Sequence, residues 1–252
     1  MQKIINQNLI SYKTVLRTYN ETTPDNKENL IRQKEIVITE VKTTQKNVFL
    51  PDKIDGYPIG DIGESAFENN DSIERVTLPK QLKNIRKNAF RNCKNLKTIN
   101  IPSSVSVIEE NSFANCTSLK SVSLLNDIMI ILDKAFDGCT QLERINMPGT
   151  SCLSNKDVFD NTAFYNNESN WENGVLYVGH CLVTAKEVKN RYKVKEGTTT
   201  IASFAFKDNT ELTDVVLPDS ITYVGYLAFD GCKSLYSITA PKGVFDYETP
   251  LF

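Results

Sequence analysis

Histidine is almost absent from this sequence of 252 residues, which contains His180 and no other. Base-assisted catalysis by serine or cysteine usually needs a positioned imidazole, and the sequence offers no carboxylate certain to orient this one. A glycine-rich phosphate loop, a dinucleotide fingerprint and the close cysteine and histidine spacings of a zinc site are also missing. We therefore expect no catalytic residue, no metal and no cofactor, in a protein that is not an enzyme.

Long apolar segments and an excess of one charge are missing as well. No run of about 18 apolar residues occurs, so we expect no membrane-spanning segment. The 29 basic and 31 acidic residues are intermingled and leave a net charge of −2, so no basic face suits a phosphate backbone. We therefore expect no nucleic-acid partner. The first residues lack the apolar stretch of a signal peptide, and the sequence leaves the location open.

Phenylalanine recurs at a step of 23 residues, apart from one step of 47 residues that spans about two coils. The anchors of this repeat are Phe67, Phe90, Phe113, Phe136, Phe159, Phe206 and Phe229. A small residue precedes six of them, and apolar residues lie in step five positions before and six, nine and eleven positions after. Such a period predicts a solenoid, in which each coil packs on its neighbours.

One coil shows how the chain is expected to run. Residues 96–101 end in alternating apolar and polar side chains, which predicts a short strand with one buried face. Pro102 then ends the strand, and a short helical or 3-10 segment carries the Ala-Phe pair inward. A lone coil buries too few side chains, at roughly 1.5–3 kcal/mol each, to offset about 1–2 kcal/mol of backbone entropy per residue. Stacking is therefore required.

Cysteine occupies one position of the repeat, three residues after the anchor. Cys93, Cys116, Cys139 and Cys232 stand there, and two other coils have Asn70 and Asn209. An alternation of Cys and Asn is typical of a turn where the side chain bonds to open backbone groups. We favour a ladder of buried thiols, with disulfides or metal between coils as the alternative.

Three segments carry a resemblance to a known family. They are residues 48–59 (VFLPDKIDGYPI), 62–67 (IGESAF) and 93–102 (CKNLKTINIP). The chain resembles the BspA-like leucine-rich repeat family over roughly residues 46–245. The resemblance implies a right-handed superhelix with one parallel strand per coil. It also implies a protein of the bacterial or protist surface that adheres to host matrix proteins or to other cells.

The repeat breaks in an irregular insert at about residues 150–197. Asn173-Gly174 and Gly179 punctuate two short apolar runs, which predicts a β-hairpin, and the family has similar inserts. Trp171, the only tryptophan, lies in this insert. It either fills the core of an irregular coil or anchors a partner.

Residues 1–45 lack the repeat, and we expect them to form an N-terminal cap on a solenoid of residues 46–252. Apolar residues between Ile5 and Tyr19 fit a helical stripe, but part of the set also fits a strand. Residues 34–41 predict a strand.

The polar residues that alternate with buried ones in the predicted strands point outward. The candidates for binding among them are Arg75, Thr98, Asn100, Arg144, Asn146 and Asp214, to which Trp171 is added. Such a face is either inert or a recognition surface, with the arginines contributing most of the binding energy. We expect a non-enzymatic module that binds another protein, such as a matrix or cell-surface component, at the cell surface or after secretion. The alternative is a structural spacer in a larger surface protein, with no ligand of its own.

Overall fold

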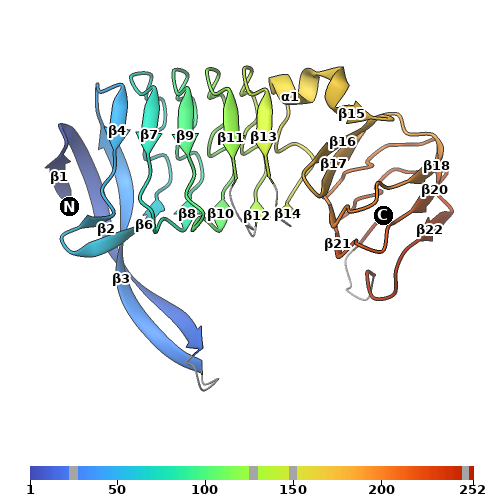
Figure 1. Cartoon of the computed structure of the whole chain (residues 1–252), viewed down its shortest axis with the longest axis horizontal. Coiled ribbons are helices and arrows are strands. Elements are labelled where there is room, and N and C mark those ends of the chain that lie inside the picture. The colour runs from blue at the N-terminus through green and yellow to red at the C-terminus, as the bar shows by residue number, and fades with distance from the viewer. Residues whose placement is uncertain (23–27, 125–129, 148–151, 246–249) are drawn as a thin grey trace.

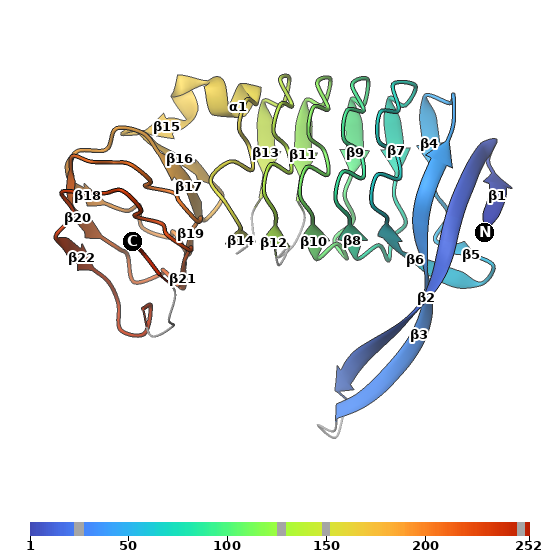
Figure 2. The ribbon, with the colours of Figure 1, turned by 180° about the vertical axis from the view of Figure 1, so that it is seen from behind.

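The computed structural model describes residues 1–22, 28–124, 130–147, 152–245 and 250–252. Figure 1 shows a solenoid whose coils lie side by side, with strands β2 and β3 projecting below it. Each coil places one strand in an upper row and one in a lower row (Figures 1 and 2). The predicted leucine-rich-repeat solenoid with parallel strands and an inserted hairpin is thereby confirmed.

The upper row contains the strands that the sequence predicts. It starts with β4 (Asn47–Phe49), β7 (Arg75–Thr77), β9 (Thr98–Asn100), β11 (Ser121–Ser123) and β13 (Arg144–Asn146). These strands pair in parallel within β4–β7–β9 and within β11–β13, and a bridge between Ile101 and Leu124 continues the row. The central residues of the first four, such as Val76 and Val122, are buried, as the alternation requires, and Ile145 of β13 is partly buried. Pro148, expected to end one of these strands, lies outside the described residues.

The lower row is a second set of strands that the sequence analysis missed. It contains β6 (Tyr57–Ile62), β8 (Asn84–Ile85), β10 (Val107–Ile108), β12 (Ile130–Ile131) and β14 (Cys152–Leu153), and β5 (Lys53–Ile54) pairs with β6. Most of these strands are two residues long, too short to show alternation. The available signal was the isoleucine that recurs five residues before the anchor. Ile85, Ile108 and Ile131, at this position, are the buried residues of β8, β10 and β12.

The arc of each coil, which carries the anchor, is a series of tight turns and not a helix. In the arc of Phe90, the amides of Ala89 and Arg91 donate to carbonyls three residues earlier. Asn88 and Asn92 have φ values of 56° and 59°, so a left-handed residue on each side of the anchor prevents a continuous helix. Arcs also bond to one another, as the Phe90 amide donates to the Ser112 carbonyl of the next coil at 2.7 Å.

The anchor rings stack along the axis of the solenoid. From Phe67 to Phe159 their centroids are 4.7 to 5.6 Å apart, and all the anchors are buried. Cysteines line the same interior, since the Sγ of Cys93 donates to the Phe67 carbonyl at 3.0 Å. The predicted ladder of free buried thiols is confirmed, and burial raises the pKa of Cys93 to about 12. The Cys152 side chain lies outside the described part of the structure.

The N-terminal residues form three antiparallel strands, so the strand interpretation of this region is correct. They are β1 (Gln2–Ile5), β2 (Asn8–Thr22) and β3 (Glu28–Lys42), and β3 pairs in parallel with β6. Ile10, Ile36 and Ile38 are buried against the first coil. Farther along, β2 and β3 leave the solenoid as a projecting arm (Figure 1).

A network of buried ion pairs holds the base of this arm. Glu35 and Asp61 are 2% and 1% exposed. Asp61 accepts hydrogen bonds from Arg17 of the arm and from Arg86 of the solenoid, the latter at 2.8 Å. Glu35 accepts from Lys83 at 3.0 Å. Charges this deeply buried are tolerated because each carboxylate meets cations from both parts.

The insert and the last coils form two further sheets of their own. The insert contains α1 (Ala163–Asn166), the 3-10 turn η1 (Glu168–Asn170), β15 (Trp171–Glu172), β16 (Val175–Val178) and β17 (Cys181–Ala185). The antiparallel pair β16–β17 is the predicted hairpin. Strand β17 leads a parallel sheet with β19 (Thr200–Ile201) and β21 (Tyr223–Val224), and β18 (Asn190–Lys193), β20 (Leu212–Val216) and β22 (Ser237–Thr239) form another. Within the described ranges, none of the helices is long and apolar enough to cross a bilayer.

Candidate functional site

The outward side chains of the upper row form one continuous surface, which we call the ladder face. Its two lines of side chains follow from the strand register. One line contains Asn47, Arg75, Thr98, Ser121 and Arg144, and the other contains Phe49, Thr77, Asn100, Ser123 and Asn146. The structure therefore brings together five of the predicted binding residues, on strands spaced roughly 4.8 Å apart.

The two arginines of the ladder face are exposed. Neither the Arg75 nor the Arg144 guanidinium forms a hydrogen bond or ion pair with the residues that the structure describes. By contrast, Glu74 at the edge of the face is held between Lys46 and Lys97, at 2.8 and 2.7 Å. Free guanidiniums beside small polar groups can donate to carboxylates or carbonyl groups of a partner.

Phe49 is a part of this surface that the sequence analysis missed. Its side chain is 56% exposed and lies beside Thr77 in the strand register. The coils were aligned on their anchors, and no anchor precedes this strand. The signal was the match of residues 47–51 to the strand pattern of residues 98–102, including the proline that follows. An exposed aromatic ring adds apolar contact area to an otherwise polar face.

A hollow of about 560 Å³ lies on the ladder face where the insert meets the solenoid. Its lining includes Ser121, Ser123, Arg144, Asn146, Phe164 and Asn170. Figure 1 shows α1 beside β13, at the end of this part of the upper row. The insert therefore supplies a wall, and the ladder face supplies the floor.

Local hydrogen bonds fix this wall. The Thr162 hydroxyl caps α1 by accepting from the Tyr165 amide at 3.0 Å. The Phe164 amide donates to the Leu142 carbonyl at 2.7 Å, which attaches the helix to the coil of Phe136. Asn170 donates to the Phe164 carbonyl at 2.8 Å and so ties η1 to α1. The shape of the hollow is therefore set in the free protein.

Two predicted residues lie elsewhere. Asp214 is on β20, in the separate sheet of the last coils, where it lies between Arg191 and Ser237. Trp171 is half-buried: its Nε1 donates to the Tyr165 carbonyl at 2.8 Å, and Lys186 Nζ lies 4.1 Å from its ring centroid. Its ring is thus occupied within the insert and does not contribute to the hollow.

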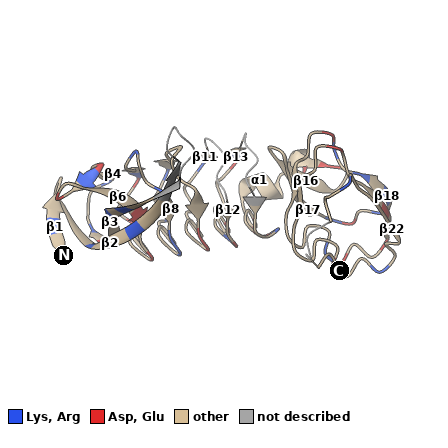
Figure 3. Ribbon diagram, turned by 90° about the horizontal axis from the view of Figure 1, so that it is seen from below, with Lys and Arg blue, Asp and Glu red and all other residues tan. Residues whose placement is uncertain are grey.

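Titratable groups show no convergent arrangement around the ladder face. In the described ranges, no three His, Cys, Asp or Glu side chains are placed to hold a metal ion. His180 is exposed, and its Nδ1 lies 2.9 Å from the Gly197 carbonyl. Figure 3 shows Lys and Arg interspersed with Asp and Glu along the coils. The surface can therefore form dispersed polar contacts.

The match to a family model decides what kind of protein this is. The model of the BspA type leucine rich repeat region matches in six copies, over residues 37–171 and 187–252. The chain belongs to this family. The break between the matched ranges falls on the hairpin β16–β17, which is the part of this BspA-type protein that departs from the repeat.

Several solved structures resemble the chain. A leucine-rich repeat protein of T. pallidum is 23% identical, with a TM-score of 0.46 and coverage of 90% of this chain and 81% of that one. A leucine-rich cell surface protein of Faecalibacterium prausnitzii is 19% identical, with a TM-score of 0.37 and coverage of 95% and 76%. The pneumococcal vaccine antigen PcpA is 18% identical, with a TM-score of 0.35 and coverage of 97% and 71%. A comparison with curated proteins gives no match.

Proposed function

We propose that this BspA-type domain is a non-enzymatic module that binds another protein through the ladder face. The single observation that carries the proposal is the preformed hollow of Arg144, Asn146, Phe164 and Asn170 at the end of a polar strand face. It combines an unpaired guanidinium, amide groups and an aromatic ring. Arginine and aromatic residues are enriched among the side chains that dominate binding energies.

The proposed partner is a matrix protein or a component of another cell's surface. The family resemblance implies such a partner, and the small polar groups of the face suit an extended polypeptide that offers alternating carbonyl and amide groups. The proposed location is the cell surface or the exterior. A role as a spacer without a ligand is the competing function, and nothing about the hollow specifically favours it.

Binding to immobilised matrix proteins and to intact host cells tests the proposal. The decisive variant is Arg144→Ala, with Arg75→Ala at the other end of the ladder face. We expect Arg144→Ala to weaken binding about tenfold or more, the effect of removing a dominant contact. Arg91→Ala is the matched control, because Arg91 is an exposed arginine on an arc, where it contacts Glu68 at 3.4 Å.

Two results would contradict the proposal. Unchanged affinity of both ladder variants would move the binding site away from this face. Absence of binding by the wild-type domain to every matrix protein and cell type would leave the spacer role as the better account. Trp171→Ala should have little effect on affinity, because its ring is engaged by Tyr165 and Lys186.

A further inference from the structure

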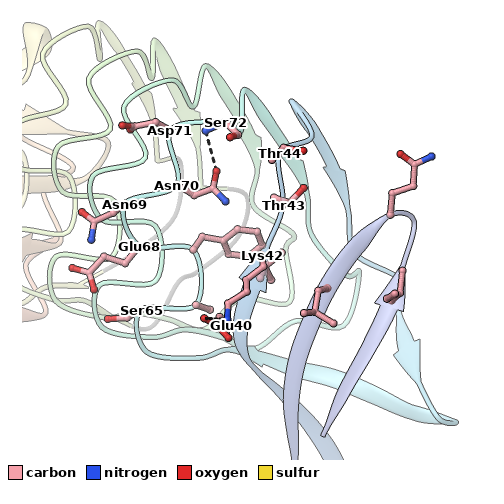
Figure 4. A pocket seen from close by; sticks show the side chains of 16 residues that line it. Glu40, Lys42, Thr43, Thr44, Ser65, Glu68, Asn69, Asn70, Asp71 and Ser72 are labelled. Carbon is pink, nitrogen blue, oxygen red and sulfur yellow. Dashed lines mark hydrogen bonds and ion pairs between the residues drawn. The ribbon is translucent and has the colours of Figure 1, made fainter.

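A second hollow, of about 700 Å³, lies at the start of the solenoid (Figure 4). We call it the entry hollow. Lys42, Thr43 and Thr44 line one side, and residues 68–72 of the first coil line the other. Its volume is in the range of ligand-binding pockets. It is separate from the ladder face and does not depend on the function proposed for that face.

The later coils show what normally fills this position. Later arcs receive backbone and side-chain hydrogen bonds from the arc before them. On the arc of Phe90, the Asn69 amide donates to the Arg91 carbonyl at 2.9 Å. The Asn69 side chain accepts from Asn92 Nδ2 at 2.8 Å, and the Phe67 carbonyl accepts from Cys93. A polypeptide segment with an amide, a carbonyl and an Asn side chain is therefore the natural occupant.

The first arc lacks these contacts. Val41 supplies one bond, from its amide to the Ala66 carbonyl at 2.8 Å, and the chain then turns away from the arc. The Glu68 carbonyl receives no hydrogen bond from the described residues, although its counterpart Arg91 does. The side-chain Nδ2 groups of Asn69 and Asn70 likewise donate to no acceptor in the described parts of the chain. One acceptor and two donors thus line the entry hollow without a partner.

The coil of Phe206 shows how an asparagine at this position can be bonded across such a gap. It too follows an interruption of the repeat, and it too has Asn, Asn209, at the cysteine position. There the insert reaches across: Asn209 donates to the Ala185 carbonyl at 3.2 Å and accepts from the Val188 amide at 2.7 Å. Asn70 has the same position in its coil, but the described residues of the cap make no such contacts with it. The two arcs differ in whether this chain bonds the asparagine, since the Lys207 carbonyl, the counterpart of Glu68, also receives no hydrogen bond from the described residues, and a hollow of about 540 Å³ lies beside it.

We propose that the entry hollow binds a short polypeptide segment of a partner protein, which completes the first arc as a preceding coil would. A peptide unit of this segment donates its N–H to the Glu68 carbonyl, and its carbonyl accepts from the side-chain Nδ2 of Asn70. An Asn or Asp side chain accepts from Asn69, extending the ladder of Asn69, Asn92 and Asn115 by one member.

Charge narrows the choice of segment. Glu40, Glu68 and Asp71 line the entry hollow. Glu40 pairs with Lys42 at 3.3 Å and Glu68 with Arg91 of the next arc at 3.4 Å, so the Asp71 carboxylate is the one without an ion pair among the described residues. An acidic segment or a free phosphate would be repelled, whereas a basic, Asn-containing segment matches both the hydrogen bonds and the charge. The chain contains a surrogate for this ligand. Residues 87–94 (KNAFRNCK) are basic, contain Asn92 and form an arc of the required shape.

The probe is a labelled synthetic peptide of residues 87–94, with serine in place of the cysteine, and fluorescence anisotropy with the full chain measures its affinity. Asn69→Gly removes one unpaired donor and keeps the backbone conformation, because Gly138 and Gly231 occupy the same position of later coils. We expect it to weaken binding at least tenfold. Asn115→Gly is the matched control in a complete coil and should bind as the wild type does.

Further variants separate this site from the ladder face. Asp71→Asn should weaken peptide binding about threefold. A second peptide, with Leu in place of Asn92, should bind the wild-type chain at least tenfold more weakly than the parent peptide does. This is the same loss as that expected for the parent peptide and Asn69→Gly. Arg144→Ala should leave peptide binding unchanged, and Asn69→Gly should leave matrix binding unchanged. Absence of peptide binding up to millimolar concentration, or equal affinity of Asn69→Gly and Asn115→Gly, would overturn the assignment. Tighter binding of an acidic peptide of the same length would do the same.

Discussion

Replacing Asp61 by Asn tests how the projecting arm is held. Asp61 is 1% exposed and accepts hydrogen bonds from Arg17 of the arm, from Asn84 at 2.7 Å and from Arg86 at 2.8 Å. Asn has the same shape but carries no charge, so Arg17 loses its nearest counter-ion and Arg86 loses one of two, keeping Glu109 at 2.6 Å. Removing one partner of a buried pair costs about 3–5 kcal/mol. Because the Arg17 and Arg86 side chains are 21% and 36% exposed, water recovers part of this loss, and we expect about 2–3 kcal/mol.

The loss should be local. Strand β3 pairs with β6 at Ile36, Val37 and Ile38, and its Val41 amide adds one bond to the Ala66 carbonyl. The arm therefore depends on the ion-pair network more than a coil that pairs with neighbours on both sides. Amide hydrogen exchange in β2 and β3 should become faster by about 30- to 150-fold, since 1.4 kcal/mol corresponds to a factor of ten. Exchange in β9 to β13 should stay near the wild-type rate.

Glu74→Gln is the control for this experiment. Glu74 also lies between two cations, but it is on the surface, where ion pairs contribute little. Its exchange pattern should resemble that of the wild type. Arm exchange within twofold of the wild type in Asp61→Asn would refute the role of the network, and a uniform increase over the whole chain would refute its local nature.

Three further outcomes are expected. Phe113→Ala removes a ring stacked 5.2 Å from both neighbours and should lower the free energy of unfolding, measured in urea, by about 3–5 kcal/mol. Phe49 is exposed, so Phe49→Ala should change that free energy by less than about 1 kcal/mol. Equal effects of the two variants would contradict the stacked core. Burial raises the pKa values of Cys93 and Cys232 to about 12 and 11. Both thiols should therefore resist alkylation at pH 8 until the protein is unfolded. Fast alkylation of the native protein would contradict their burial. Hydrogen bonds from Lys46 and Lys97 lower the pKa of Glu74 to about 2. The contribution of the Glu74 carboxylate to stability should therefore be complete above its ordinary pKa of 4.5 and should disappear as the pH falls through 2. NMR titration of the carboxylate checks this, and a midpoint near 4.5 would contradict the pairing.

The repeating parts of the fold were predictable because burial acts at the same position in every coil. The register that placed Phe90, Cys93 and Ile99 in the interior follows from periodicity alone, and the structure buries all three. The 23-residue period placed an isoleucine at the lower row but did not identify it as part of a strand, since two residues are too few to show alternation. It also could not describe the arm, where Glu35 and Asp61 are buried by contacts that join segments remote in sequence.

The candidate site was predictable where it consists of strands. Thr98, Asn100, Arg144 and Asn146 share the ladder face because the pleat alternates inward and outward side chains. Asp214 was placed on the same surface by the same rule, but the insert separates its sheet from β13. The wall of the hollow was missed because the position of α1 depends on a hydrogen bond to Leu142 that no local pattern encodes.

The residue three places after the anchor has a consequence for rearranging such proteins. A cysteine there needs an arc carbonyl directly before it, as Cys93, Cys116, Cys139 and Cys232 each have. An asparagine there follows a cap or an insert. Cysteine-bearing units should therefore be interchangeable with one another by deletion or duplication, whereas a unit with asparagine belongs behind a break. The residue at this position of a single repeat therefore indicates whether the repeat follows another regular coil or an interruption such as a cap or an insert.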